Sequence, residues 1–72
     1  MEKIYCLGDI CPIPIMKLQK KMTAIKNGAS VQLITDHSCT VTTLAEFCKA
    51  HQLVYVANEV ISGVWEIEVS NK

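Results

Sequence analysis

The stretch Cys11-Pro12-Ile13-Pro14 marks the point where the sequence changes from a strand pattern to a helix pattern. Before it, apolar and other residues alternate over residues 3–6, which predicts a short strand with one buried side. After it, apolar residues recur every three or four positions, at Ile15, Leu18, Met22 and Ile25. This spacing predicts one amphipathic helix that ends at Asn27-Gly28, since glycine is a common C-terminal cap. The two prolines fit its first turn, where no backbone N–H donates within the helix.

The rest of the chain alternates strand and helix again and then closes with two strands. The sequence predicts strands at residues 30–35, 53–57 and 64–69, and a second helix that begins near residue 41 and ends near His51. The order β-α-β-α-β-β predicts a single domain over residues 1–72 of the α/β (α+β) class. We expect a two-layer α/β sandwich, with a mixed four-stranded sheet and two helices on one face. The first two strands should be parallel, and the last two should form an antiparallel hairpin.

The composition argues against several functional classes. Seven lysines balance seven acidic residues and there is no arginine, whereas direct binding of nucleic acid needs a net basic surface. No apolar run approaches the roughly 20 residues of a membrane span, and residues 1–6 lack the apolar segment of a signal peptide, so we expect a cytoplasmic location. The four cysteines form no Cys-x-x-Cys pair, and His37 and His51 complete no zinc pattern. We expect no metal and no cofactor.

The predicted topology brings two cysteines to one edge of the sheet. Both helices begin beyond the C-terminal ends of parallel strands, which is the usual ligand edge of α/β proteins. Cys11 begins the first predicted helix, and Cys39 lies at the start of the second. A helix N-terminus stabilises a thiolate and attracts anions. We therefore predict Cys11 and Cys39 as catalytic residues for sulfur chemistry, with His37 orienting an anion or moving a proton.

Each of these residues also has a purely structural interpretation, and the sequence leaves the choice open. Cys11 would then be a tolerated capping residue, Cys39 a half-buried turn residue, and His37 a solvated loop residue. We predict Asp9 and Asp36 as loop and cap residues rather than catalytic acids, because negative charge opposes thiolate formation.

The remaining candidates are lysines and two further cysteines. Lys17, Lys20 and Lys21 lie away from the apolar stripe of the first helix, either as a solvated side or as a docking surface for a partner. Cys6 and Cys48 continue apolar faces, so we predict that both pack in the core.

The motif Cys11-Pro12-Ile13-Pro14 resembles the hallmark of the TusA-like (SirA-like) sulfur-carrier family, in which a Cys-Pro-x-Pro motif opens the first helix. The resemblance covers nearly the whole chain, since length and order of elements also match. It implies a fold like the C-terminal domain of bacterial translation initiation factor three. It also implies that Cys11 carries sulfur as a persulfide, with Pro12, Ile13 and Pro14 as supporting residues. Lys20 stands where the family often has a basic residue.

The turn after the second predicted strand narrows the resemblance. Asp36-His37-Ser38-Cys39-Thr40 contains a Cys-Thr pair, which is similar to the YeeD branch of the family. That branch works with a YeeE-type membrane thiosulfate transporter. The similarity implies that thiosulfate donates its sulfane sulfur to Cys11, that Cys39 assists, and that His37 and Thr40 support the substrate.

The residue patterns and the family resemblance together imply three possible functions. The first is a sulfurtransferase that takes sulfane sulfur from thiosulfate onto Cys11, releases sulfite and passes the sulfur on, recruited by a transporter to the inner face of the membrane. The second is a relay carrier that is loaded by a protein persulfide and serves another sulfur-relay protein, for example towards tRNA thiolation. The third is a non-catalytic redox or interaction module, in which Cys11 and Cys39 form a reversible disulfide.

Overall fold

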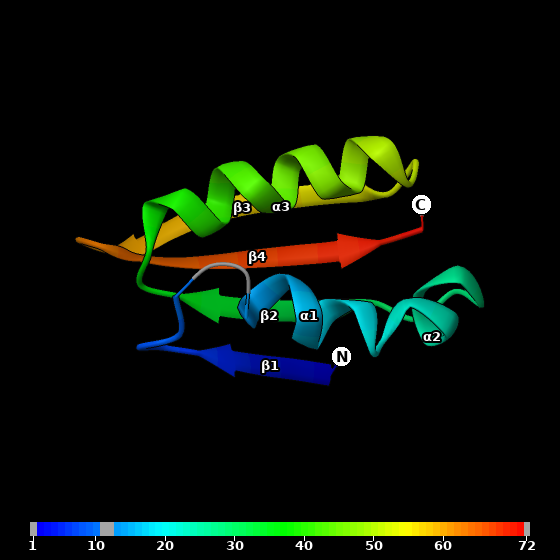
Figure 1. Cartoon of the computed structure of the whole chain (residues 1–72), viewed down its shortest axis with the longest axis horizontal. Coiled ribbons are helices and arrows are strands. Elements are labelled where there is room, and N and C mark those ends of the chain that lie inside the picture. Colours follow the sequence, from blue (N-terminus) through cyan, green and yellow to red (C-terminus); the bar gives the residue numbers. More distant parts are fainter. Residues whose placement is uncertain (1, 11–12, 72) are drawn as a thin grey trace.

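The computed structural model describes residues 2–10 and 13–71, and within them it contains four strands and three helices (Figure 1). In chain order these are β1 (Glu2–Cys6), α1 (Ile13–Gln19), α2 (Met22–Lys26), β2 (Val31–Thr35), α3 (Ser38–Ala50), β3 (Val54–Ile61) and β4 (Val64–Ser70). Among the described helices, none is both long and apolar enough to cross a membrane.

The four strands form one mixed sheet in the order β1-β2-β4-β3. β1 and β2 are parallel because a helical segment crosses between them, whereas β4 pairs antiparallel with both β2 and β3. α1 packs over β1 and β2, and α3 packs over β3 and β4, so the helices cover one face of the sheet (Figure 1). The mixed four-stranded sheet, the α+β class and the final hairpin predicted from the sequence are confirmed.

The core lies between the helices and the covered face of the sheet. Alternate residues of β1, β2 and β4 point into it, and Leu18, Ile25 and Leu44 meet them from the three helices. Full burial of an aliphatic side chain contributes about 1.5–3 kcal/mol, so Leu18 helps to anchor α1, the helix that follows the motif, together with Pro14 and Ile15. Cys6 and Cys48 are fully buried in this core, as predicted.

The first helix is divided, which gives three helices where the spacing predicts two. α1 and α2 are separated by a turn at Lys20 and Lys21. There the Lys21 N–H donates to the Leu18 carbonyl, three residues back, at 2.8 Å, so the chain makes one tighter turn than an α-helix has. Leu18 and Ile25 on either side are both fully buried. The apolar stripe therefore continues across the break.

Two elements extend by more than one residue beyond their predicted bounds. α3 begins at Ser38 rather than near residue 41, so Cys39 and Thr40 lie in its first turn. β3 continues to Ile61 rather than ending at residue 57, because its pairing with β4 runs on to Glu59 and, after a register shift, includes Ile61.

Candidate functional site

Two loops leave the same edge of the sheet, one after β1 and one after β2. The parallel register places Cys6 beside Thr35, and these are the last residues of the two strands. Residues 7–10 continue from β1 towards the motif, and residues 36–37 continue from β2 into α3. The two loops therefore start side by side, as the predicted topology requires.

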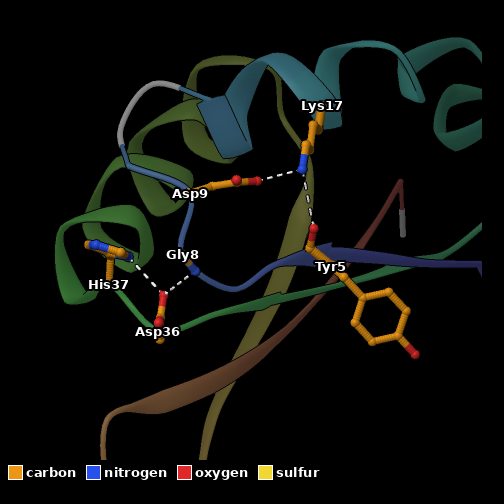
Figure 2. A network of polar contacts seen from close by, with 6 residues as sticks. All are labelled: Tyr5, Gly8, Asp9, Lys17, Asp36 and His37. Atoms are coloured by element: carbon orange, nitrogen blue, oxygen red, sulfur yellow. Dashed lines mark hydrogen bonds and ion pairs between the residues drawn. The ribbon is translucent and has the colours of Figure 1, made fainter.

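A hydrogen bond ties the two loops together (Figure 2). The first loop turns where the Asp9 N–H donates to the Cys6 carbonyl at 3.0 Å, and Gly8 within this turn has a φ of +83°. A side chain is strained at that φ, so the turn requires glycine. The Gly8 N–H then donates to Oδ1 of Asp36 at 3.0 Å. Asp36 thus joins the loop before the motif to the loop before α3.

Asp36 is held in its charged form. The bond from the Gly8 N–H lowers the pKa of the Asp36 carboxyl; desolvation opposes this shift, and His37 adds to it. Nδ1 of His37 lies 2.8 Å from the same Oδ1 that accepts the Gly8 N–H. A negative charge therefore stands just before the first turn of α3, where the partial positive charge of a helix N-terminus favours it.

A second set of contacts anchors the first loop to α1 (Figure 2). Nζ of Lys17 lies 2.5 Å from Oδ2 of Asp9 and donates to the Tyr5 carbonyl at 3.3 Å. The hydrogen bond to Asp9 raises the pKa of Lys17, so Lys17 stays protonated through the neutral range. Lys17 belongs to the helix after Cys11, and its two partners come before Cys11. The Lys17–Asp9 pair therefore connects the chain before the motif to the helix after it.

These contacts restrict which lysines remain available for docking. Lys17 is paired with Asp9, and Nζ of Lys21 lies 2.5 Å from Oε2 of Glu2. Lys17 and Lys21 are half-buried, whereas Lys20 is exposed in the turn between α1 and α2. Docking through these lysines stays a prediction, and Lys20 is its strongest candidate.

The other predicted site residues divide between surface and interior. Cys39 is exposed in the first turn of α3, His37 is half-buried just before it, and Ile13 is exposed at the start of α1. Pro14 and Thr40 are fully buried. Their side chains therefore lie inside this edge, and a role for them in supporting the substrate stays a prediction.

The thiols of the described residues differ in accessibility. Cys39 is exposed, whereas Cys6 and Cys48 are fully buried. Desolvation by burial is the main cause that raises the pKa of Cys6 and of Cys48, so neither forms the reactive thiolate at neutral pH. Cys11 and Pro12 lie outside the described residues. Across residues 2–10 and 13–71, no three His, Cys, Asp or Glu side chains gather into a group that could hold a metal ion.

Apolar side chains are exposed along the first loop and α1. Leu7, Ile10, Ile13 and Met16 stand three residues apart and are 40–61% exposed. The Ile13 N–H donates to the Ile10 carbonyl at 2.9 Å, and Met16 lies one helical turn after Ile13 on the same side. We call these four residues the apolar edge. Contiguous exposed apolar surface is a common feature of sites that bind other proteins, which makes the apolar edge a candidate for such contact.

The sequence patterns did not predict the Gly8–Asp36 bond or the Lys17–Asp9 pair. It predicts Asp9 and Asp36 only as loop and cap residues, and Lys17 as a solvated or docking residue, whereas all three hold the first loop in place. One signal is present, because an aspartate directly follows β2 and a glycine lies in the loop that follows the parallel strand β1. The pattern alone does not say which N–H meets that carboxylate.

The chain is similar to known sulfur-carrier proteins. The family model described as sulfurtransferase TusA matches residues 2–71. A sulfur carrier protein TusA of Buchnera aphidicola subsp. Baizongia pistaciae is 41% identical over 39 residues, which cover 54% of this chain and 49% of that protein. The match thus spans about half the length of that relative. A putative sulfur carrier protein of Methanocaldococcus jannaschii is 25% identical over 59 residues, which cover 82% of this chain and 79% of that protein.

The fold also matches a solved structure. The crystal structure of a SirA-like protein from Desulfitobacterium hafniense superposes with a TM-score of 0.87 at 24% sequence identity. The match covers 96% of this chain and 95% of the other. It supports the arrangement of the sheet and helices described above.

Proposed function

Since the chain belongs to the TusA family of sulfurtransferases, we propose that it carries sulfur as a persulfide on Cys11 and passes that sulfur to a protein partner. One observation carries the proposal: the loop that leads to Cys11 is tied on both sides, to Asp36 through Gly8 and to Lys17 through Asp9. Transfer of sulfur between two proteins needs a thiol in a defined place, and a fixed loop before that thiol serves this need.

The two buried cysteines are poorly suited as the carrier. Cys6 and Cys48 are buried, and their raised pKa values keep them as neutral thiols. Pro12 and Pro14 follow the carrier in the motif, and the burial of Pro14 anchors the start of α1. The motif prolines thus act as supports and Cys11 as the nucleophile.

The surroundings of the motif favour a protein as the sulfur donor. Lys17 offsets the charge of Asp9, but Asp36 keeps a charged carboxylate on the loop before α3, and negative charge repels a dianion such as thiosulfate. The apolar edge offers instead the kind of surface that another protein covers. We therefore favour a relay in which a partner's persulfide loads Cys11 and a second sulfur-relay protein receives the sulfur.

A second candidate is supported by the exposed thiol of Cys39 at the start of α3, with His37 beside it. In this reaction the Cys11 thiolate attacks the sulfane sulfur of thiosulfate and forms a new S–S bond. The bond between the two sulfur atoms of thiosulfate breaks, and sulfite leaves with its electron pair. Thr40 would support this edge from inside, and a YeeE-type transporter would deliver thiosulfate at the inner face of the membrane.

Mass spectrometry of the reduced protein separates the two candidates. Reduced protein is incubated either with a cysteine desulfurase and cysteine or with thiosulfate alone. The relay predicts one added sulfur with the desulfurase in wild type and in Cys39→Ser, and none in Cys11→Ser. Loading by thiosulfate with release of sulfite, slowed in Cys39→Ser, would support the second candidate instead. If neither donor adds sulfur to Cys11, both candidates are wrong.

Substitutions at two exposed apolar residues test whether the desulfurase docks on the apolar edge. One residue lies on the apolar edge, and the other lies elsewhere and serves as the control. Met16 is 55% exposed on α1, and Ile61 is 66% exposed at the end of β3. Met16→Glu should lower the rate of loading by the desulfurase about tenfold, because a charge replaces about 1.4 kcal/mol of apolar contact. Loading by glutathione persulfide should not change, and Ile61→Glu should change neither rate. Equal desulfurase rates for Met16→Glu and wild type would exclude the apolar edge as the docking surface.

A further inference from the structure

The bond between Gly8 and Asp36 joins two segments at matching positions. Gly8 stands three residues before Cys11, and Asp36 stands three residues before Cys39. The bond is the 3.0 Å contact from the Gly8 N–H to Oδ1 of Asp36 (Figure 2). It therefore connects the chain just before one predicted thiol to the chain just before the other.

Each of the two segments is also anchored on its own side. Asp9 of the first loop is held by Lys17 of α1. In the second loop, the His37 N–H donates to Oγ1 of Thr35 at 3.2 Å, and Thr35 is fully buried at the end of β2. The pairing of β1 with β2 sets the starts of the two loops side by side, and the bond to Asp36 joins them again beyond the ends of the strands.

We propose that Asp36 is a positioning residue that holds the two cysteine-bearing segments together, so that Cys39 can attack a persulfide on Cys11. The inference rests on the proposed function, because it requires sulfur on Cys11. Asp36 touches neither sulfur atom in this role and acts through the Gly8 N–H. The reaction discharges a carrier that has met no acceptor protein.

The reaction balances without an added oxidant. The Cys39 thiol loses its proton to water, and the thiolate attacks the inner sulfur of the Cys11 persulfide. A disulfide bond forms between the two cysteines, the bond to the outer sulfur breaks, and hydrosulfide leaves with the electron pair. The outer sulfur is reduced and the Cys39 sulfur is oxidised, while the Cys11 sulfur keeps the oxidation state that it has in the persulfide. Dithiothreitol then returns the disulfide to two thiols.

Release of hydrosulfide from loaded protein tests the proposal. Reduced protein is loaded with glutathione persulfide and separated from the excess reagent, and hydrosulfide and the protein mass are followed with time. Wild type should release hydrosulfide and form an internal disulfide, whereas Cys39→Ser should keep its added sulfur. Asp36→Ala should slow the release roughly tenfold, because lost orientation is costly in a reaction between fixed groups.

A conservative variant separates the hydrogen bond from the charge. Asp36→Asn removes the charge but keeps an oxygen that can accept the Gly8 N–H, so its release rate should stay within about twofold of wild type. Asp36→Ala removes both charge and acceptor. If Asn is as slow as Ala, the charge rather than the bond is responsible and the proposal is wrong. A wild-type rate for Asp36→Ala would also overturn it.

The hairpin between β3 and β4 provides a matched control. Oε2 of Glu59 accepts the Gly63 N–H at 2.9 Å, and Gly63 has a φ of +82°, so this contact has the same chemistry as the Asp36 contact. Glu59→Ala should leave the release rate unchanged. Protein that takes up sulfur on Cys11 but releases no hydrosulfide would contradict the inference and leave the proposed function standing. Protein that takes up no sulfur would contradict the proposed function itself.

Discussion

Replacing Leu18 by alanine tests whether the packing of α1 holds the motif side of the sheet. Leu18 is fully buried in the core, on the helix that directly follows Pro12. Leucine-to-alanine changes at such sites cost about 2.7–5 kcal/mol, because the lost contacts leave a cavity that relaxes only in part. A domain of 72 residues has a total stability of about 4–11 kcal/mol. The variant should therefore lose about 3 kcal/mol, a large share of that total.

Urea denaturation measures this loss, with the fluorescence of Trp65 as the signal. Trp65 is the one tryptophan of the chain and packs against the core. A loss of about 3 kcal/mol corresponds to a fall in Tm of about 12–24 °C for a domain of this size. Met16→Ala is the control, since Met16 lies on the same helix with 55% exposure and should change the stability by under about 0.5 kcal/mol. A loss below about 1 kcal/mol for Leu18→Ala, or equal losses for both variants, would refute this account of α1.

Three further results are expected. Iodoacetamide at about pH 8 should label Cys39 in the folded protein but label Cys6 and Cys48 only after unfolding, because burial raises the pKa of both. Peptide mass spectrometry identifies the labelled cysteines. Equal labelling of the three cysteines in the folded state would contradict this expectation. The pKa of Asp36 is lowered in the folded protein, so its contribution to stability is present above about pH 4 and is lost as the pH falls further. The Tm of Asp36→Asn should therefore fall less than that of wild type on acidification from about pH 5 to about pH 2, and parallel curves would exclude this contribution. Lys20→Glu should slow loading by a desulfurase while the urea stability stays within about 0.5 kcal/mol of wild type, and an unchanged loading rate would remove Lys20 from the docking surface.

The periodicity of the sequence predicted most of the fold because burial follows periodicity. Ile4 and Cys6 alternate with exposed residues in β1, and both are buried. Leu18 and Ile25 lie on one face of the helical region and are buried as well. Both results agree with the apolar pattern of the sequence. The turn between α1 and α2 could not be predicted in the same way. It falls at Gln19-Lys20-Lys21-Met22, where neither glycine nor proline interrupts the pattern. The apolar stripe keeps its helical spacing on both sides of this turn, so the sequence pattern does not reveal that the helix is divided.

The site was harder to predict because its contacts join residues far apart in the sequence. The parallel pairing of β1 with β2 follows from the order of elements, and so does the start of both loops at one edge. The bond from Gly8 to Asp36 joins residues 28 positions apart, and it depends on the φ of Gly8 and on the register of the two strands. Lys17 has the sequence features of a solvated lysine, and its position beside Asp9 depends on how α1 sits over the end of β1.

The central claim is that Cys11 carries the sulfur, and its most direct test is the location of that sulfur in the loaded protein. Wild type is loaded with glutathione persulfide, its free thiols and persulfides are alkylated, and the peptides that contain Cys11 and Cys39 are compared by tandem mass spectrometry. The account predicts one additional sulfur atom on Cys11 and none on Cys39 at the earliest times. Additional sulfur that is found first on Cys39, or on neither residue, would contradict it.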